Sequence, residues 1–504
     1  MISTVMPVMK RLSLLLLLGL VPGMMAAKKP KAPPPAPVAV AAPVVDPEAW
    51  RATPPAPLPE GDWAPPVAKT FKLSNGIPVY FVENPALPLA SVRLVMTVGR
   101  EANPAGKAGL GALTANLLDE GTKSRDSAAI ASTAGSLGAN LSVGAGEEWA
   151  SVSLDALTGA PLGPSLDLFA DVALNPRFDA KDFARVQAET ITSIQSAKAD
   201  PREVASRVFA AQLYGAGHPY GIPAIGDEAT VASIKSGDVK KFYQTWWHAG
   251  NAAFVVTGKV DEAGLKAELE KRFGVWKVGK SVHPVPAAAS MPLKTRLVFV
   301  EQPGAVQSVI RVGTPGPKRT APDFQAANVA GTIVGGMFSS RLNINLREEH
   351  GWSYGAYGGF TESRDAGVFA ARTSVQADKT APAVVEILKE LTAAAAKPPS
   401  DKELGLAKDS LIKSLPGNFE TNAATAGSFL AVPVMGLGPD YWAGWLTDLH
   451  KVDAAASEAQ AKRYFDAAKM LIVVAGPRTI TVDGTTVDVV TELKALGYDF
   501  VEVK

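Results

Sequence analysis

The dipeptide Glu349-His350 raises the question of whether this chain binds a catalytic zinc ion. In a zinc motif of the form H-x-x-E-H, the two histidines lie one helical turn apart and bind the same ion. The glutamate between them activates the metal-bound water. Here Leu346 occupies the position of the first histidine, so this segment lacks one of its ligands. Zinc chemistry would therefore need histidines elsewhere in the chain.

The remaining histidines do not supply a second pair. No two of the five lie close together in sequence: His218, His248, His283, His350 and His450. A zinc site assembled from these scattered histidines stays open as an alternative. The chain has no cysteine, which excludes disulfides, thiolate zinc sites and cysteine nucleophiles.

Length and composition are typical of a packed globular protein with two or three domains. The chain has 504 residues, of which 47% are hydrophobic. The net charge is +1, and no long basic run lies outside the N-terminal region, which argues against nucleic acid as the main partner.

The first 27 residues are predicted to be a signal peptide. Lys10 and Arg11 precede an apolar core from Leu12 to Val21, which is short for a membrane span, and small residues at Ala26-Ala27 offer a cleavage point. The alternative is a short membrane anchor. We expect an exported chain without stable membrane insertion, periplasmic if the cell has an outer membrane. Residues 28–62 are rich in proline and alanine and are predicted to form an extended tether.

The rest of the chain is predicted to contain two domains of similar pattern, 63–281 and 293–504, joined by a Pro/Ala-rich linker at 282–292. Each domain contains a helical segment, "KDFARVQAETITSIQSA" or "DKELGLAKDSLIKSLPG", upstream of an apolar run that ends at Gly258 or Gly476. The order of elements also matches. This pattern predicts an internal duplication of an α+β unit.

Several motifs resemble landmarks of the pitrilysin/insulinase-type (M16) peptidases, the family that includes the mitochondrial processing peptidase and its bacterial relatives. They are "LSNGIPVYFVEN", "GLGALTANLLDEGT", "ALNPRF", "GHPYGIPAIG" and "SSRLNINLREEHGWSYGAYGGF". The resemblance covers roughly Phe71 to Gly476. It implies two homologous domains in a clam-shell arrangement, each a mostly antiparallel sheet with helices packed on one face.

The resemblance also locates a degenerate zinc site. Active members carry H-x-x-E-H on the first-domain helix and a distant glutamate as a further ligand. In the register set by "GLGALTANLLDEGT", these positions fall on Ala112, Ala115, Asn116 and Ser193. Glu189 lies one turn before Ser193, but no histidines accompany it as zinc ligands. We therefore expect no metal in this chain.

A second family feature is retained. Active members carry an arginine and a tyrosine seven residues apart, which touch substrate near the scissile bond, and Arg347 and Tyr354 match them. An arginine can hold a peptide carbonyl and a tyrosine hydroxyl can donate to a developing oxyanion. The alternative is that Arg347 is a solvated helix charge and Tyr354 a half-buried strand residue.

Three other features are predicted to be structural. His218 is expected to be a turn residue, and Trp246-Trp247 to pack in a core. The Gly335-Gly336 pair is expected to allow close backbone approach.

Together these features predict a non-catalytic, substrate-contacting subunit of an exported zinc endopeptidase. The resemblance implies a heterodimer in which a zinc-binding sibling of the same family holds the metal and this chain supplies the Arg/Tyr pair in trans to a peptide substrate. The competing prediction is a peptide-binding or structural scaffold with no peptidase role, as in the respiratory-complex relatives of the family.

Overall fold

The computed structural model describes residues 48, 51, 59, 61–215, 217–280, 284–286, 289, 293–365 and 367–503. The chain divides into two compact units, Met1–Glu60 and Gly61–Lys504, and both large sheets belong to the second unit. The predicted signal peptide and most of the predicted tether and linker lie outside the described residues. The predicted boundaries of the two domains therefore stay predictions.

The first half of Gly61–Lys504 is built on a six-stranded sheet with the strand order β1-β2-β6-β3-β5-β4. Its hairpin β1–β2 turns at Asn75-Gly76, where Gly76 has a φ of 88°. The strands are β1 (Lys69–Lys72), β2 (Pro78–Glu83), β3 (Leu89–Met96), β4 (Asn140–Ala145), β5 (Ala150–Leu157) and β6 (Ala252–Gly258).

The second half is built on another six-stranded sheet, in the order β14-β7-β11-β8-β10-β9. Its strands are β7 (Arg296–Glu301), β8 (Gln307–Gly316), β9 (Ser353–Phe360), β10 (Gly367–Gln376), β11 (Leu471–Gly476) and β14 (Asp499–Val503). A separate small hairpin pairs β12 (Thr479–Val482) with β13 (Thr485–Asp488).

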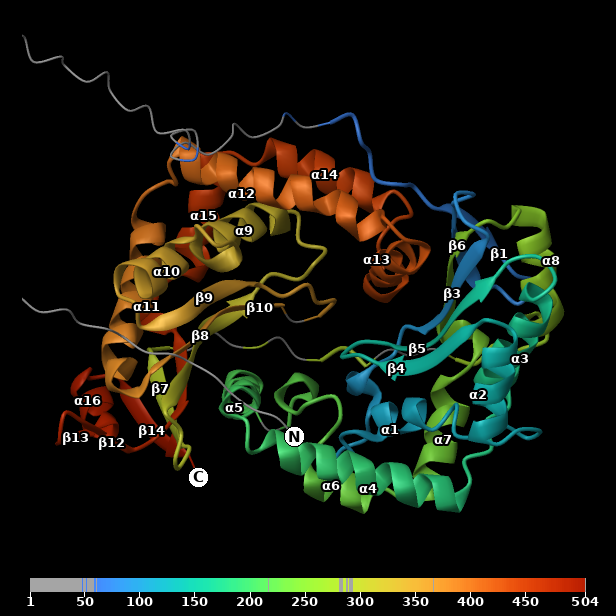
Figure 1. The fold of residues 1–504 in the computed structure, drawn as a ribbon, viewed down its shortest axis with the longest axis horizontal. Coiled ribbons are helices and arrows are strands. Elements are labelled where there is room, and N and C mark those ends of the chain that lie inside the picture. Colours follow the sequence, from blue (N-terminus) through green and yellow to red (C-terminus); the bar gives the residue numbers. More distant parts are fainter. Residues whose placement is uncertain are drawn as a thin grey trace, which may run out of the picture. The chain divides into compact units, whose positions relative to one another are not determined.

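Helices surround both sheets (Figure 1). In the first half they are α1 (Leu110–Asn116), α2 (Ser127–Ser136), α3 (Leu162–Leu174), α4 (Ala180–Ala197), α5 (Pro201–Tyr214), α6 (Glu228–Ser233), α7 (Ser236–Trp246) and α8 (Glu262–Phe273). In the second half they are α9 (Phe324–Gly331), α10 (Arg341–Asn343), α11 (Thr380–Ala396), α12 (Asp401–Ser414), α13 (Asn422–Met435), α14 (Tyr441–Lys451), α15 (Ala454–Tyr464) and α16 (Val489–Ala495). Two π-helical segments, η5 (Thr332–Gly336) and η6 (Ile344–Glu349), flank α10.

The helix starts follow from local sequence. Asp200 caps α5 by accepting a hydrogen bond from the backbone N–H of Arg202, and Pro201 occupies the first turn, where its missing N–H costs nothing. Helix α12 begins with a capping box in which Ser400 and Glu403 bond each other's backbone.

The two sheets repeat the same pattern around a central strand. Strand β6 pairs in parallel with β2 and antiparallel with β3, and β11 pairs in parallel with β7 and antiparallel with β8. Both central strands end at the predicted glycines, Gly258 and Gly476. The predicted α+β class with two homologous sheet-and-helix domains is confirmed. One difference is that the outer strand β14 comes from the end of the chain and pairs in parallel, whereas β1 pairs antiparallel with β2.

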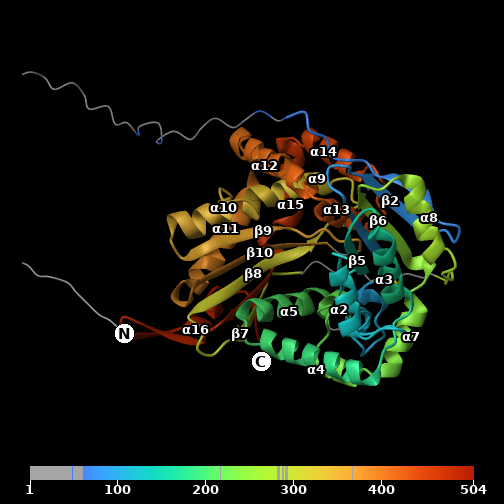
Figure 2. The same ribbon diagram turned by 45° about the vertical axis from the view of Figure 1, so that its right-hand side comes forward.

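Each half also sends a helix to the sheet of the other half. Helix α5 packs on β8 and β11 of the second sheet, and Figure 1 and Figure 2 show α5 next to β8 from two directions. Helix α13 packs on β3 and β6 of the first sheet. Fully buried side chains carry these contacts: Phe209 of α5 clusters with Val298 and Val473, and Phe429 of α13 with Val95 and Val255. Burying one Phe contributes roughly 1.5–3 kcal/mol, so the exchanged helices hold the halves together.

Among the described residues, no helix combines the length and the apolar character needed to cross a bilayer.

Candidate functional site

Helix α1 carries three of the four predicted zinc-site positions. Gly109 precedes the helix with a φ of 93°, a conformation that favours glycine, and this fixes where the helix starts. Ala112 and Ala115 are buried in the first core and Asn116 is exposed. The fourth position, Ser193, is exposed on α4, which packs against α1.

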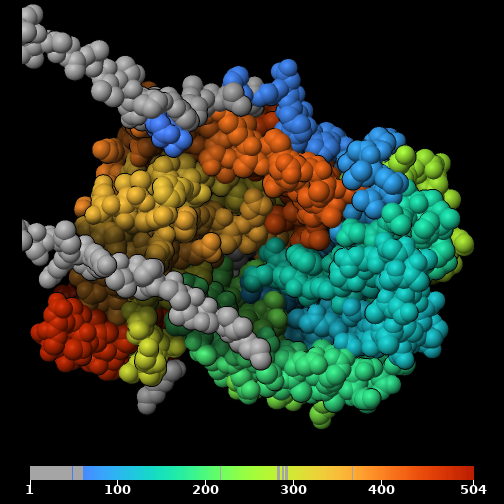
Figure 3. Space-filling model, viewed as in Figure 1, coloured from blue at the N-terminus to red at the C-terminus, as the bar shows by residue number. Residues whose placement is uncertain are grey.

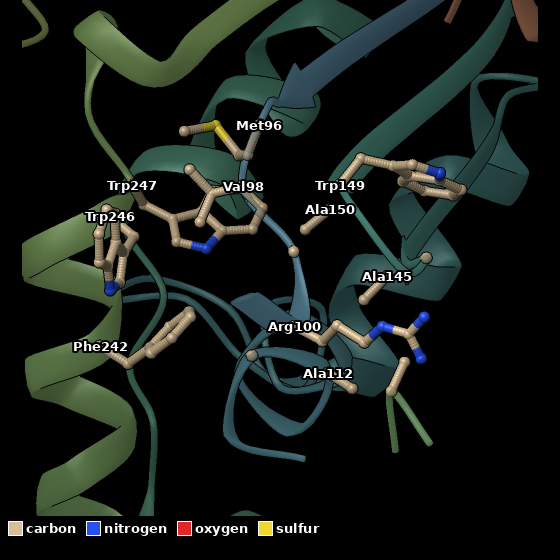
Figure 4. A pocket seen from close by; sticks show the side chains of 14 residues that line it. Met96, Val98, Arg100, Ala112, Ala145, Trp149, Ala150, Phe242, Trp246 and Trp247 are labelled. Carbon is tan, nitrogen blue, oxygen red and sulfur yellow. The ribbon is translucent and has the colours of Figure 1, made fainter. Parts of the chain in front are cut away.

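A cavity of about 10 Å³ lies beside Ala112 (Figure 4). Its lining is mostly apolar, with Trp149, Phe242 and Trp247 around it and Arg100 as the only charged side chain. None of its lining residues is His, Asp, Glu or Cys, the donors that zinc uses. Across the described parts of the chain, no group of three such residues is arranged to hold a metal ion. The residues present at this place therefore do not fit zinc.

The other acidic and histidine candidates have structural partners. Glu189 accepts from Arg185 at 3.0 Å on the exposed face of α4. His350 stacks on Trp352 with ring centroids 4.0 Å apart, and Leu346 is fully buried. The Glu349-His350 pair thus belongs to the end of η6 and its following turn.

The structural predictions for the other motifs are confirmed. Nδ1 of His218 accepts from the backbone N–H of Tyr220 at 3.0 Å, which closes a tight turn. Trp247 is buried and Trp246 packs against the same core. A Cβ at Gly335 would lie 2.3 Å from the backbone nitrogen of Gly358, so this glycine brings η5 against strand β9.

Arg347 and Tyr354 lie on consecutive elements, η6 and β9. Arg347 is partly exposed. Its guanidinium carbon lies 4.7 Å from the ring centroid of Phe338, and its Nε lies 3.3 Å from Glu348. Tyr354 is 90% exposed, an unusual state for a tyrosine in a strand. Among the described residues β9 is the last strand of its sheet. Its outer edge is partly covered, because the backbone N–H of Ala356 donates to Oδ1 of Asn343 at 3.2 Å and η5 packs against Gly358.

Tyr354 lines a groove of about 560 Å³ between strands β8, β9 and β10 and the start of α5. Arg347 is not among the residues that line it. The structure thus brings Tyr354 to an open groove, whereas Arg347 is stacked on Phe338 and does not line that groove.

The groove contains residues that sequence reasoning missed. Arg311 and Arg372 come from β8 and β10, and Arg202 comes from α5. No motif links them, but one signal was available: Arg311 interrupts the apolar run "VIRVG", where a charge needs a reason.

A polar cluster joins the two halves beside a second, larger hollow of about 740 Å³. In the space-filling view the surface is hollowed between first-half residues in cyan and second-half residues in orange (Figure 3). The hydroxyl of Tyr220 donates to buried Glu148, whose two oxygens accept from the backbone N–H of Arg364 at 3.0 Å. Burial, and next the charge of Glu148, raise the pKa of the Tyr220 phenol, so it remains a donor.

Comparison with known proteins matches two family models to this chain. The model described as Insulinase (Peptidase family M16) matches residues 79–226, and the one described as Peptidase M16 inactive domain matches residues 233–411. An uncharacterized zinc protease of Mycobacterium tuberculosis is 28% identical over 341 residues, which is 67% of this chain and 77% of that protein.

Solved structures show the same fold. The crystal structure of a peptidase M16 inactive domain from Pseudomonas fluorescens has a TM-score of 0.76 and 27% identity, and covers 83% of this chain and 99% of that one. The periplasmic protease PqqL from Escherichia coli has a TM-score of 0.68 and 16% identity, and covers 84% of this chain and 48% of that one.

Proposed function

Because this chain belongs to the insulinase-type (M16) peptidase family but lacks residues that fit zinc, we propose that it is a non-catalytic, substrate-contacting subunit of an M16 zinc endopeptidase. In this proposal a sibling subunit of the same family holds the zinc ion. The two chains form a heterodimer, and this chain contributes contacts to the peptide substrate.

One contrast carries the proposal: the residues at the predicted zinc site cannot bind metal, whereas the tyrosine of the predicted Arg/Tyr pair is exposed to a groove. At the zinc-site positions the side chains are Ala112 and Ala115, both buried, and exposed Asn116. In the second half Tyr354 is retained and 90% exposed on the wall of an open groove. An exposed phenol that packs against nothing contributes little to folding, whereas it is free to donate a hydrogen bond to a ligand.

The groove also supports an extended peptide as the ligand. Among the described residues β9 is the last strand of its sheet, so a peptide can pair with it near Tyr354, before the part of its edge that Asn343 and η5 cover at Ala356 and Gly358. A peptide held there lies beside Tyr354, whose hydroxyl donates to a peptide carbonyl oxygen. Arg347 takes part by leaving Phe338 and Glu348 for the substrate, since both contacts are at a partly exposed surface.

Export is part of the proposal. The apolar N-terminal segment of the sequence and the likeness in fold to a protease described as periplasmic support it. The partner is accordingly an exported M16 sibling.

A scaffold role is the second candidate. The observation that favours it is the position of Arg347, whose guanidinium is engaged by Phe338 and Glu348 and does not line the Tyr354 groove. A scaffold of this fold binds partners or peptides without contributing to any reaction.

Co-expression with an M16 sibling that carries an intact H-x-x-E-H motif tests the proposal. We expect a one-to-one complex that contains zinc and cleaves unfolded peptide much faster than the sibling alone, while this chain alone contains no stoichiometric zinc. A sibling that is fully active alone and never binds this chain would favour the scaffold role. Zinc bound by this chain alone, removed by a chelator together with peptidase activity, would overturn both candidates.

A further inference from the structure

Two arginines lie opposite each other on the face of the second sheet against which α5 packs. In the antiparallel pairing of β8 and β10, Arg311 lies directly opposite Arg372, and Arg372 in turn lies opposite Tyr357 of β9. Side chains directly opposite one another share one face of a sheet, with Cβ atoms about 5 Å apart. The result is a lateral row of two guanidinium groups and a phenol that ends on β9, the last strand of the sheet.

Like charges directly opposite each other destabilise a sheet. Arg202 of α5 adds a third positive charge to the same groove, and Glu203 is the only acidic residue in its lining, which leaves an excess of two positive charges. Within the described residues, none of the three arginines forms an ion pair with a carboxylate. The residues that line this groove therefore do not neutralise its positive charge.

Arg311 is also incompletely satisfied. Its guanidinium carbon lies 5.3 Å from the ring centroid of Phe209, and its Nε is buried with no hydrogen-bond partner in the structure. Burial and then Arg372 lower the pKa of Arg311, while Glu203 opposes this. An arginine remains charged in proteins, so the missing partner is an acceptor that the chain does not provide.

The groove that holds these arginines is open and is also the groove lined by Tyr354. Carboxylates match the planar guanidinium fork and accept two parallel hydrogen bonds from it. A peptide paired with the edge of β9 would carry side chains, or its C-terminus, across the sheet toward Arg372.

We propose that Arg311 and Arg372, with Arg202, form a carboxylate-binding site for an acidic group of an extended peptide that pairs with β9 next to Tyr354. The carboxylate is either an Asp or Glu side chain or the peptide's own C-terminus. This inference rests on the proposed function, because that function identifies the ligand as a peptide. It adds that the peptide carries a negative charge.

Three labelled peptides of one extended apolar sequence test the site. The first has a central Gln and a C-terminal amide, the second a central Glu and an amide, and the third a central Gln and a free C-terminal carboxylate. Binding to the full purified chain is measured by fluorescence anisotropy at low salt. We expect one or both acidic peptides to bind about tenfold or more tightly than the neutral one, because a charge-assisted hydrogen bond contributes that much.

Variants then connect the preference to the arginines. Arg372→Gln, at an exposed position, is expected to remove the preference for the acidic peptide and leave binding of the neutral peptide unchanged. Arg311→Gln is expected to do the same, with retained folding checked by thermal unfolding. Arg463→Gln on α15, outside the groove, removes the same charge and is expected to leave the preference intact.

The outcomes separate this inference from the proposed function. Equal binding of acidic and neutral peptides, unchanged in the arginine variants, would overturn the carboxylate site while peptide binding stands. Suppose that peptide binding depends on charge and on Arg372, but that this chain has no effect on a sibling's peptidase activity. That result would support the carboxylate site and overturn the peptidase role. Absence of binding by all three peptides would overturn the carboxylate site as stated.

Discussion

Arg364 donates a hydrogen bond from Nη2 to Oε1 of Glu101 at 2.9 Å, and this ion pair joins the two halves of the protein. Arg364 lies in the loop between β9 and β10, and Glu101 lies in the 3₁₀ turn that follows β3. The Glu101 side chain is fully buried, and its Oε1 also accepts from the backbone N–H of Gly99. The loop that follows the Tyr354 strand is thus held by the first half.

Loss of Arg364 should destabilise the fold. In Arg364→Met the Glu101 carboxylate stays buried without its counter-charge, and breaking such a pair typically costs about 3–5 kcal/mol. We expect the free energy of unfolding in urea to fall by about 3 kcal/mol, and to recover in part when Glu101→Gln is added. The matched control Arg463→Met breaks an exposed pair with Asp323 and should cost less than about 1 kcal/mol. Equal losses in the two single variants would contradict this assignment.

Adding one methyl group at Gly335 should disturb strand β9. A Cβ there would meet the backbone of Gly358 at 2.3 Å, and backbone cannot move aside as a flexible side chain can. We expect Gly335→Ala to lower the free energy of unfolding by about 1–3 kcal/mol. In contrast, a Cβ at Gly405 within α12 meets nothing within 4 Å.

Gly405→Ala provides the control for that experiment. Alanine restricts the unfolded chain and favours helix, so this variant should be more stable than wild type by about 0.5–1 kcal/mol. Opposite signs for the two Gly→Ala changes are the expected result. A neutral Gly335→Ala would mean that η5 and β9 do not pack in direct backbone contact.

Much of the fold followed from local patterns, while the groove did not. The turn at Asn75-Gly76 and the glycines that close β6 and β11 were recognisable because turns and strand ends restrict residue type. The amphipathic pattern of α5 shows that Phe209 and Leu213 need burial, but it does not say which sheet buries them. Long-range packing decides which sheet buries α5 and which buries α13, because the two sheets offer similar apolar surfaces.

The arginine row illustrates the same limit at the site. Arg311 and Arg372 are 61 positions apart in sequence, and only the register of β8 with β10 brings them opposite each other. A shift of one residue would put Arg372 on the other face. Tyr354 was found because a motif names it, whereas the stacking of Arg347 on Phe338 depends on the π-helical turn of η6, which no sequence pattern predicted.

Stability should depend on pH through Glu403. Burial raises the pKa of this carboxyl, but hydrogen bonds from Arg341 and Ser400 outweigh it and lower the pKa to about 2. Because the pKa of Glu403 is lowered in the folded state, its ionised carboxylate stabilises the fold fully above the pKa of the unfolded chain, near 4.5. This stabilisation is lost as pH falls from there toward 2. Because the side chain is partly exposed, we expect it to contribute about 1 kcal/mol at neutral pH.

Glu403→Gln provides the measurement. At pH 7 the free energy of unfolding of the variant should be about 1 kcal/mol lower than that of wild type. This difference should shrink between pH 4.5 and pH 2. Glu349→Gln, at an exposed position, serves as the control and should change stability by less than about 0.5 kcal/mol at neutral pH. A difference at Glu403 that is the same at pH 7 and pH 3 would show that charge is not its source.

Removal of the Tyr354 hydroxyl should affect turnover without affecting assembly. Tyr354 is 90% exposed, so Tyr354→Phe should leave the stability of this chain within about 0.5 kcal/mol of wild type and leave the heterodimer intact. Loss of one oxyanion donor typically slows turnover about a hundredfold or more, and we expect at least a tenfold decrease in kcat in complexes of confirmed stoichiometry. Tyr498→Phe, between α16 and β14 and outside the groove, is the matched control and should retain at least half of the wild-type kcat. Arg347→Ala should raise KM as well, since it removes a contact made to bound substrate. Wild-type kinetics in both the Tyr354 and the Arg347 variants, with one zinc ion still bound by the sibling, would assign the pair a structural role and leave the scaffold function in its place.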